Sequence, residues 1–152
     1  MVAVIQAHGG SIDKFLGDGI MATFGAAQAS ETYAADALRA LDGAIIEAGR
    51  WRAAKQAAGM ACPVVNGAAA SGRILFGAVG DETRLEYTVI GEAVNLSAKL
   101  EQHNKVLGVR ALTDATTYER ALAQGYAPGQ AARRVSAAEV TGLGQPVDLV
   151  VL

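Results

Sequence analysis

The order of strand-like and helix-like segments is the feature that most constrains how this chain of 152 residues folds. Short apolar runs, typical of strands, alternate with longer segments whose apolar residues recur three and four positions apart, as on one face of a helix. No internal repeat and no linker-like composition interrupts them. Helices are expected at 2–7, 31–58 and 92–105, followed by a short helix whose N-cap is Thr113 or Asp114. Strands are expected at 11–25 as a hairpin, at 63–70 and 73–79 as a pair that turns at Ser71-Gly72, and at 84–90, 109–112 and 146–152.

Composition agrees with a single α+β domain in which helices cover an antiparallel-rich sheet. Apolar residues make up 51% of the chain and charged residues 18%, as in a domain that buries a core. The formal net charge of −2 gives no basic surface for nucleic acid or lipid headgroups. Cys62 has no partner for an internal disulfide, and no apolar run reaches the roughly 20 residues that span a membrane. We therefore expect a cytoplasmic domain without a membrane segment and without a nucleic-acid partner.

The predicted hairpin carries charges that a purely structural hairpin does not need. Residues 9–25 read GGSIDKFLGDGIMATFG, and strand alternation places Lys14 on one face and Asp13 on the other, each among apolar neighbours. One interpretation is that Asp18 is a turn former and Lys14 extends its amine to water. The other is that the Asp18 carboxylate is a hard oxygen ligand for Mg²⁺ and the nearby amine contacts a polar ligand.

A second motif favours the functional interpretation. The stretch that begins at Gly72 reads GRILFGAVGDETRLEYTVIGEAVNLSAKL. Together with DKFLGDGIMATFG it resembles the catalytic domain of class III adenylyl and guanylyl cyclases, and the likeness extends from Gly9 to Leu152. The GGSID segment is also similar to diguanylate cyclases, but the rest of that signature is absent. The resemblance implies the ferredoxin-like cyclase sandwich, an α+β fold.

The resemblance also implies a reaction and a substrate. Such cyclases are dimers with two active sites at their interface, where the ribose 3'-hydroxyl of ATP attacks the α-phosphate in line and releases cyclic AMP and pyrophosphate. Asp18 matches the second of two aspartates that hold two divalent ions, Mg²⁺ or Mn²⁺. Lys14 and Thr88 match the pair that reads the purine, and guanylyl cyclases have glutamate and cysteine there. Because an ammonium can donate to N1 of adenine and a hydroxyl can accept from its 6-amino group, the pair favours ATP. In the dimer, Asp18 and Lys14 of one chain would serve different sites.

Three further residues receive roles from the resemblance. Asn95 matches the asparagine that positions the ribose, and Lys99 stands where most members have an arginine that stabilises the transition state. The two are four positions apart on a predicted helix, so they share one face. Arg73 matches a basic residue that contacts the triphosphate. Without the motif, Asn95 and Lys99 would be read as a solvated helix face and Arg73 as a solvent-exposed arginine at a strand edge.

Departures from the family pattern leave alternatives open. Thr141 stands where the family has a phosphate-contacting lysine, and an ammonium at Lys99 lacks the planar fork of a guanidinium. The family's first strand, which carries the first metal aspartate, and its first helices have no match here, so residues 1–152 are expected to form a partial cyclase domain that is inactive alone. The alternatives are a catalytically inactive cyclase-homology domain that dimerises or binds nucleotide as a regulatory module, and a purely structural α+β domain.

Overall fold

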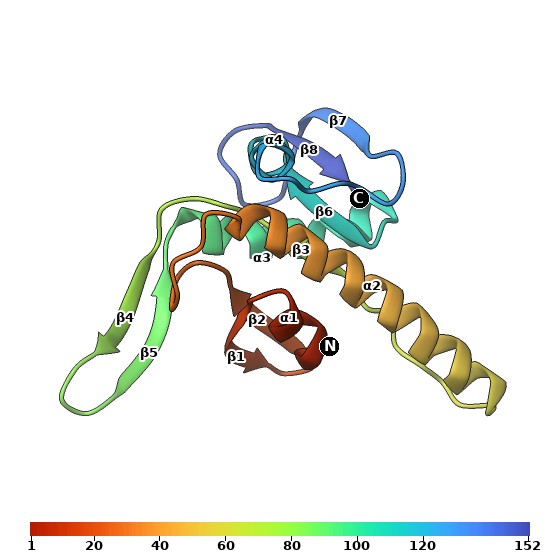
Figure 1. The fold of residues 1–152 in the computed structure, drawn as a ribbon, viewed down its shortest axis with the longest axis horizontal. Coiled ribbons are helices and arrows are strands. Elements are labelled where there is room, and N and C mark those ends of the chain that lie inside the picture. Colours follow the sequence, from red (N-terminus) through yellow and green to blue (C-terminus); the bar gives the residue numbers. More distant parts are fainter.

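A computed structural model describes residues 1–152 as a layered α+β body from which two hairpins project (Figure 1). The helices are α1 (Val2–Ala7), α2 (Tyr33–Ala57), α3 (Glu92–Leu107) and α4 (Ala115–Ala123). The strands are β1 (Ser11–Leu16), β2 (Gly19–Thr23), β3 (Gly67–Ala69), β4 (Leu75–Gly80), β5 (Leu85–Ile90), β6 (Ala111–Asp114), β7 (Arg133–Ala138) and β8 (Val147–Val151). The α+β class predicted from the sequence is confirmed.

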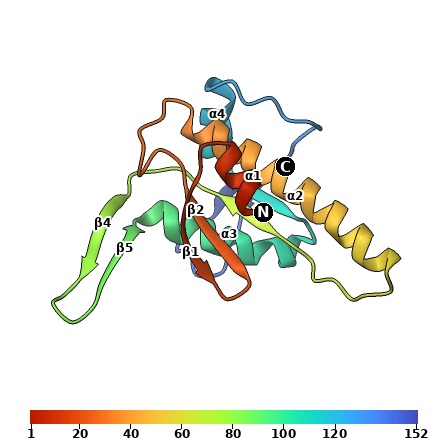
Figure 2. The ribbon, with the colours of Figure 1, turned by 60° about the horizontal axis from the view of Figure 1, so that its bottom comes forward.

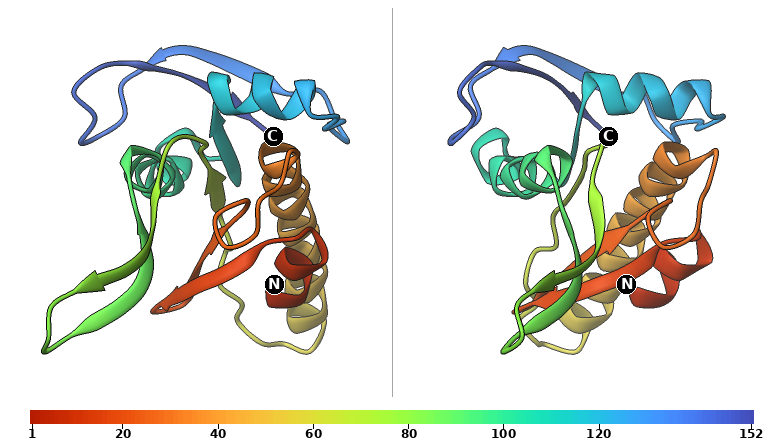
Figure 3. Two further views of the ribbon diagram at one scale, coloured as in Figure 1. Left: turned by 60° about the vertical axis from the view of Figure 1, so that its left-hand side comes forward. Right: turned by 90° about the vertical axis from the view of Figure 1, so that its left-hand side faces the viewer.

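The body is a four-stranded sheet in the order β3-β6-β8-β7, with helices on both faces. Strand β3 runs parallel to β6, whereas β8 is antiparallel to both of its neighbours. Neighbouring residues of β8 point to opposite faces, as the two-residue period of a strand requires. Val150 joins a buried cluster with Leu38 of α2 and Tyr118 of α4, and Leu149 joins a second cluster with Leu100 of α3. Helices α2 and α4 therefore cover one face and α3 covers the other (Figure 3).

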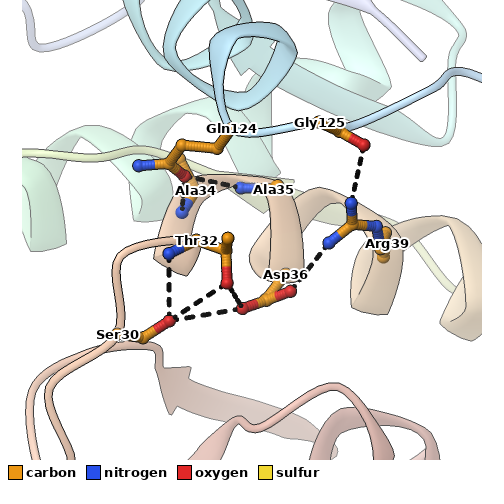
Figure 4. A network of polar contacts seen from close by, with 8 residues as sticks. All are labelled: Ser30, Thr32, Ala34, Ala35, Asp36, Arg39, Gln124 and Gly125. Atoms are coloured by element: carbon orange, nitrogen blue, oxygen red, sulfur yellow. Dashed lines mark hydrogen bonds and ion pairs between the residues drawn. The ribbon is translucent and has the colours of Figure 1, made fainter.

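The start of α2 is joined to the end of α4 by a polar network (Figure 4). The first backbone N–H groups of a helix have no acceptor within the helix. Gln124 Oε1 accepts from the N–H groups of Ala34 and Ala35, at 2.8 and 3.1 Å. Arg39 pairs with Asp36 at 2.8 Å and donates to the carbonyl of Gly125 at 2.7 Å. These contacts hold the two helices that cover one face of the sheet.

Two hairpins stand outside the four-stranded sheet (Figure 2). The first is β1–β2, which the sequence predicted at 11–25, and the second is β4–β5, which we call the arm. The arm projects from the body at the point where β5 leads into α3. No helix of the structure is both long enough and apolar enough to cross a bilayer.

The predicted pairing of 63–70 with 73–79 is wrong. Strand β3 instead pairs with β6, and β4 pairs with β5. The reason lies in the hydrogen bonds of β3, because the Gly67 carbonyl accepts from Asn104 Nδ2 at 2.9 Å and the Ala69 carbonyl accepts from the Thr113 hydroxyl at 2.9 Å. The three small residues of this edge strand are half-buried, and Gly67 has no room for a Cβ beside Leu41. Strand β7 was not predicted.

Of the two predicted N-caps, Thr113 and Asp114, the structure has Asp114. Its carboxylate accepts from the backbone N–H of Thr117 at 3.0 Å, at the third position of α4. The Thr117 hydroxyl also accepts from the backbone N–H of Ser71 at 2.8 Å. The segment after β3 is thereby tied to the start of α4 rather than turned back as a hairpin.

Candidate functional site

The two hairpins contact each other through four polar side chains that we call the hairpin cluster: Asp13 and Lys14 of β1 with Glu86 and Thr88 of β5. The Thr88 hydroxyl donates to Asp13 Oδ2 at 3.0 Å. Lys14 Nζ lies 3.7 Å from the same oxygen and 3.3 Å from Glu86 Oε2. Two side chains that the sequence singled out, Lys14 and Thr88, therefore meet at one carboxylate oxygen.

An irregularity in β1 makes this meeting possible. The pairing of β1 with β2 shifts register between Ile12 and Lys14, so Asp13 is an extra residue in the ladder. A bulge of this kind can redirect a side chain. The predicted alternation, with Lys14 on one face and Asp13 on the other, is wrong because Asp13 and Lys14 both reach side chains on the same face of β5.

The side chains of the hairpin cluster differ in how much of each is exposed to solvent. The Asp13 side chain is 3% exposed, that of Lys14 is 31% exposed and that of Glu86 is 46% exposed. Thr88 is buried at the residue level. Hydrogen bonds from Arg84 first, and then from Lys14, hold the pKa of Glu86 below its ordinary value. The cluster thus places a partly exposed ammonium and a buried hydroxyl beside a covered carboxylate.

Asp18 lies at the tip of the first hairpin. Leu16 pairs with Gly19, so Gly17 and Asp18 form a two-residue turn in which Gly17 has a φ of 64°. This left-handed conformation suits glycine. Asp18 is exposed, and its carboxylate makes no hydrogen bond or ion pair within the chain.

The donor chemistry of Asp18 fits a divalent ion shared with a nucleotide. Magnesium is commonly bound by one or two carboxylates together with phosphate oxygens and waters. No group of three or more His, Cys, Asp or Glu side chains gathers in residues 1–152 as a ready-made metal centre. Asp18 is therefore a single exposed carboxylate that belongs to no such group.

The remaining predicted residues flank the start of α3. Asn95 is exposed one turn into this helix, and Arg73 is exposed in the segment between β3 and β4. A Cβ on Gly91, the N-cap of α3, would lie 2.8 Å from the Arg73 carbonyl, so the close approach of these two backbones requires a glycine. Neither the Asn95 nor the Arg73 side chain has a hydrogen-bond partner within the chain.

Lys99 reaches the turn that contains Thr141. Its ammonium lies where a Cβ on Gly142 would be, and Gly142 has a φ of 80°. This turn belongs to the segment Glu139–Pro146, which lines a hollow of about 350 Å³. The Lys99 ammonium therefore lies beside the turn that contains Thr141. Thr141 stands at the position where the resemblance calls for a lysine.

The sequence singled out Lys14 and Thr88 as candidate residues but not Asp13 or Glu86. The structure brings Lys14 and Thr88 together, and it places Asp18 at a turn tip and Asn95, Lys99 and Arg73 around α3 and its approach. The available signal for Asp13 was a carboxylate within an apolar strand, because a covered carboxylate requires donors. The signal was not decisive, since the bulge that directs Asp13 toward β5 leaves no mark in the residue pattern.

Comparisons with known proteins agree on one kind of fold. No protein-family model matches the chain. The adenylyl cyclase CyaB of P. aeruginosa superposes with a TM-score of 0.80 at 26% identity, covering 99% of this chain and 74% of that one. The guanylyl cyclase Cya2 superposes with a TM-score of 0.74 at 24% identity, covering 99% of this chain and 73% of that one.

A sequence relative points the same way. Adenylate cyclase 1 of Rhizobium meliloti is 31% identical over 109 residues, which are 72% of this chain. The match spans 16% of that protein's length, so the relative contains much that this chain does not match.

Proposed function

Because the chain belongs with the class III adenylyl and guanylyl cyclase catalytic domains, we propose that it is an adenylyl cyclase-type domain with an ATP site. The reaction of such a site is in-line attack of the ribose 3'-hydroxyl on the α-phosphate, with cyclic AMP and pyrophosphate as products. The residues of this chain would bind and orient the nucleotide.

The observation that carries the proposal is the meeting of Lys14 and Thr88 at Asp13. Asp13 and Thr88 are 75 positions apart in the sequence, and each hairpin supplies one member of the base-reading pair. The ammonium of Lys14 has only donors, and N1 of adenine is an acceptor. The Thr88 oxygen can accept from the 6-amino group. Guanine reverses both groups, with a carbonyl at position 6 and an N–H at position 1, so this pair supports selection of ATP.

The phosphate and ribose contacts are assigned to the unpaired side chains. Asp18 would hold a Mg²⁺ or Mn²⁺ ion, which supplies charge stabilisation to the attacking and leaving oxygens when bound. Asn95 would position the ribose, while Lys99 and Arg73 would approach the triphosphate. All four residues lack a side-chain hydrogen bond or ion pair within the chain, which leaves them available to a ligand.

A specific observation favours a second candidate function, a nucleotide-binding regulatory module without turnover. Lys99 supplies an ammonium at the position of an arginine and lies beside Thr141, which is uncharged. An ammonium lacks the bidentate geometry that a guanidinium offers to phosphate oxygens. The site would then bind ATP but stabilise the transition state poorly.

We assign the exposed arm to contact with a second copy of the chain. One face of the arm carries Phe76, Leu85 and Tyr87, which are 41%, 67% and 70% exposed. We call these three residues the outer face of the arm. Apolar groups this exposed are typical of surfaces that another chain covers. We therefore expect two copies of the chain to form a homodimer, and the sedimentation coefficient of the chain tests this.

The proposed function is tested by nucleotide binding and product formation together. The purified chain is titrated with ATP and with GTP in the presence of Mn²⁺, and cyclic AMP is measured after incubation with ATP. We expect ATP to bind at least about tenfold more tightly than GTP, because a mismatched polar pair in a covered site costs about 1–3 kcal/mol. Because Lys99 replaces an arginine and Thr141 a lysine of the family pattern, we expect little or no cyclic AMP from the chain alone. Tighter binding of GTP would refute the ATP site, and cyclic AMP production would reject the inactive module.

A further inference from the structure

We propose that Asp13 is a positioning residue that sets base specificity by fixing which way the Thr88 hydroxyl points. This inference rests on the proposed function, because it assumes that Thr88 faces the base. It adds a residue that does not itself contact the nucleotide.

The hydrogen bond between the two side chains has one possible direction. A carboxylate is only an acceptor, so the Thr88 hydroxyl must donate its single proton to Asp13 Oδ2, which lies at 3.0 Å. The oxygen of Thr88 then keeps its lone pairs for another group. A free threonine hydroxyl can rotate to donate or to accept, and the bond to Asp13 removes this choice.

The fixed hydroxyl distinguishes the two purines. Adenine offers an amino group at position 6, which can donate to the lone pairs of Thr88. Guanine in the same orientation offers a carbonyl oxygen, which would face those lone pairs without a proton between them. A covered polar group left without a partner is costly, so the site is expected to reject guanine at this position.

Burial shows why Asp13 acts through Thr88 rather than directly. Its side chain is 3% exposed, and the same oxygen that accepts from Thr88 lies 3.7 Å from Lys14 Nζ. The carboxylate thus lies beneath both members of the pair. Lys14 also has Glu86 at 3.3 Å, so its ammonium keeps a carboxylate partner when Asp13 is changed.

The variant Asp13→Asn tests the role of the carboxylate. An asparagine side chain has nearly the same shape but carries donors as well as an acceptor, so the Thr88 hydroxyl is free to accept from it and donate to guanine. We expect the ratio of the GTP dissociation constant to the ATP dissociation constant to fall by about tenfold, mainly through tighter GTP binding. Both constants are measured by titration of the full chain with Mn²⁺ present.

Two control variants separate this effect from charge and packing. Glu119→Gln removes a carboxylate from an exposed ion pair with Arg134, outside the hairpin cluster, so we expect the ratio to stay within about twofold of the wild-type ratio. In a Thr88→Val background, where no hydroxyl remains, Asp13→Asn should not change the ratio further. A ratio that Asp13→Asn leaves within twofold of wild type overturns the inference, as does an equal change in the valine background.

Failure of the inference differs from failure of the proposed function. A wild-type chain that does not prefer ATP contradicts the function and removes the basis for a role of Asp13. A wild-type preference that survives Asp13→Asn contradicts only the role of Asp13. If the variant does not fold, the wild-type Thr88 hydroxyl proton is sought by NMR. Slow exchange and proximity to the Asp13 β-protons support the inference, and rapid exchange with water overturns it.

Discussion

Gln124 shows how one side chain can link two helices. Its Oε1 atom accepts from the N–H groups of Ala34 and Ala35, which are 1% and 0% exposed. These N–H groups lie in the first turn of α2, where no carbonyl of the helix can reach them. The glutamine follows the last turn of α4, so a single amide oxygen joins the two helices that cover one face of the sheet (Figure 4).

The variant Gln124→Ala is expected to destabilise the fold. Two covered N–H groups would lose their acceptor, which costs about 1–3 kcal/mol of unfolding free energy. The matched variant Gln124→Glu keeps an acceptor oxygen and adds a negative charge near a helix N-terminus, where it is favourable, so it should remain within about 1 kcal/mol of wild type. Urea denaturation measures both. Equal stability of the alanine variant and wild type would contradict the capping role.

Single residues could be singled out from the sequence where a motif or a local rule was enough. The N-cap at Asp114 follows from the chemistry of caps, and Lys14 and Thr88 followed from the resemblance. Asp13 did not, because its direction depends on the bulge between Ile12 and Lys14. A strand period of two cannot report an extra residue in the ladder.

At the scale of elements, the arm carries many exposed large apolar side chains: Leu75, Phe76, Val79, Leu85, Tyr87 and Ile90. Phe76 and Tyr87 pack edge to face, with ring centroids 5.2 Å apart, although both rings remain exposed. Cross-strand pairing puts them on the face opposite Thr88 and Glu86. The arm therefore turns one face toward the hairpin cluster and leaves the other, its outer face, exposed.

The variant Tyr87→Lys is expected to weaken self-association. Placing a charge among Phe76 and Leu85 opposes burial of the outer face, and a central aromatic in an interface commonly contributes about 2 kcal/mol or more, or about thirtyfold in the dissociation constant. Sedimentation velocity over a range of concentrations measures this. Leu122→Lys is the matched control, because Leu122 is also exposed but lies on α4. A monomeric wild type, or equal effects of both variants, would contradict a dimer through the arm.

Elements with local signals were predicted well, and those fixed by distant partners were not. The first hairpin, α2 and α3 follow from turn residues and apolar spacing. Strand β3 has three small residues and acquires its partner from β6, more than forty positions later in the chain. The register of β7 against β8 is irregular between Val135 and Ala138, which hides its period.

At the scale of the whole molecule, the layered body and the hairpins have different roles. The sheet and the helices on its two faces hold the core, while the hairpins bring Lys14 and Thr88 together outside it. Neither hairpin alone contains the pair. Base recognition is therefore expected to depend on how the body positions β1 against β5.

The proposed base-reading role of Lys14 and Thr88 is tested most directly by exchanging them for the glutamate and cysteine of guanylyl cyclases. In Lys14→Glu/Thr88→Cys, the carboxylate can accept from N1–H and the 2-amino group of guanine, and the thiol can donate to its carbonyl. Arg84 remains to pair with Glu86. The matched control, Lys105→Glu/Thr116→Cys, makes the same changes at exposed positions of α3 and α4.

The measurement is the ratio of ATP to GTP dissociation constants for the wild type, the exchanged pair and the control. We expect the exchange to reverse the preference from ATP to GTP and the control to keep the wild-type ratio. A ratio that the exchange does not move, with both nucleotides still bound, would contradict the assignment of Lys14 and Thr88 as the residues that read the base.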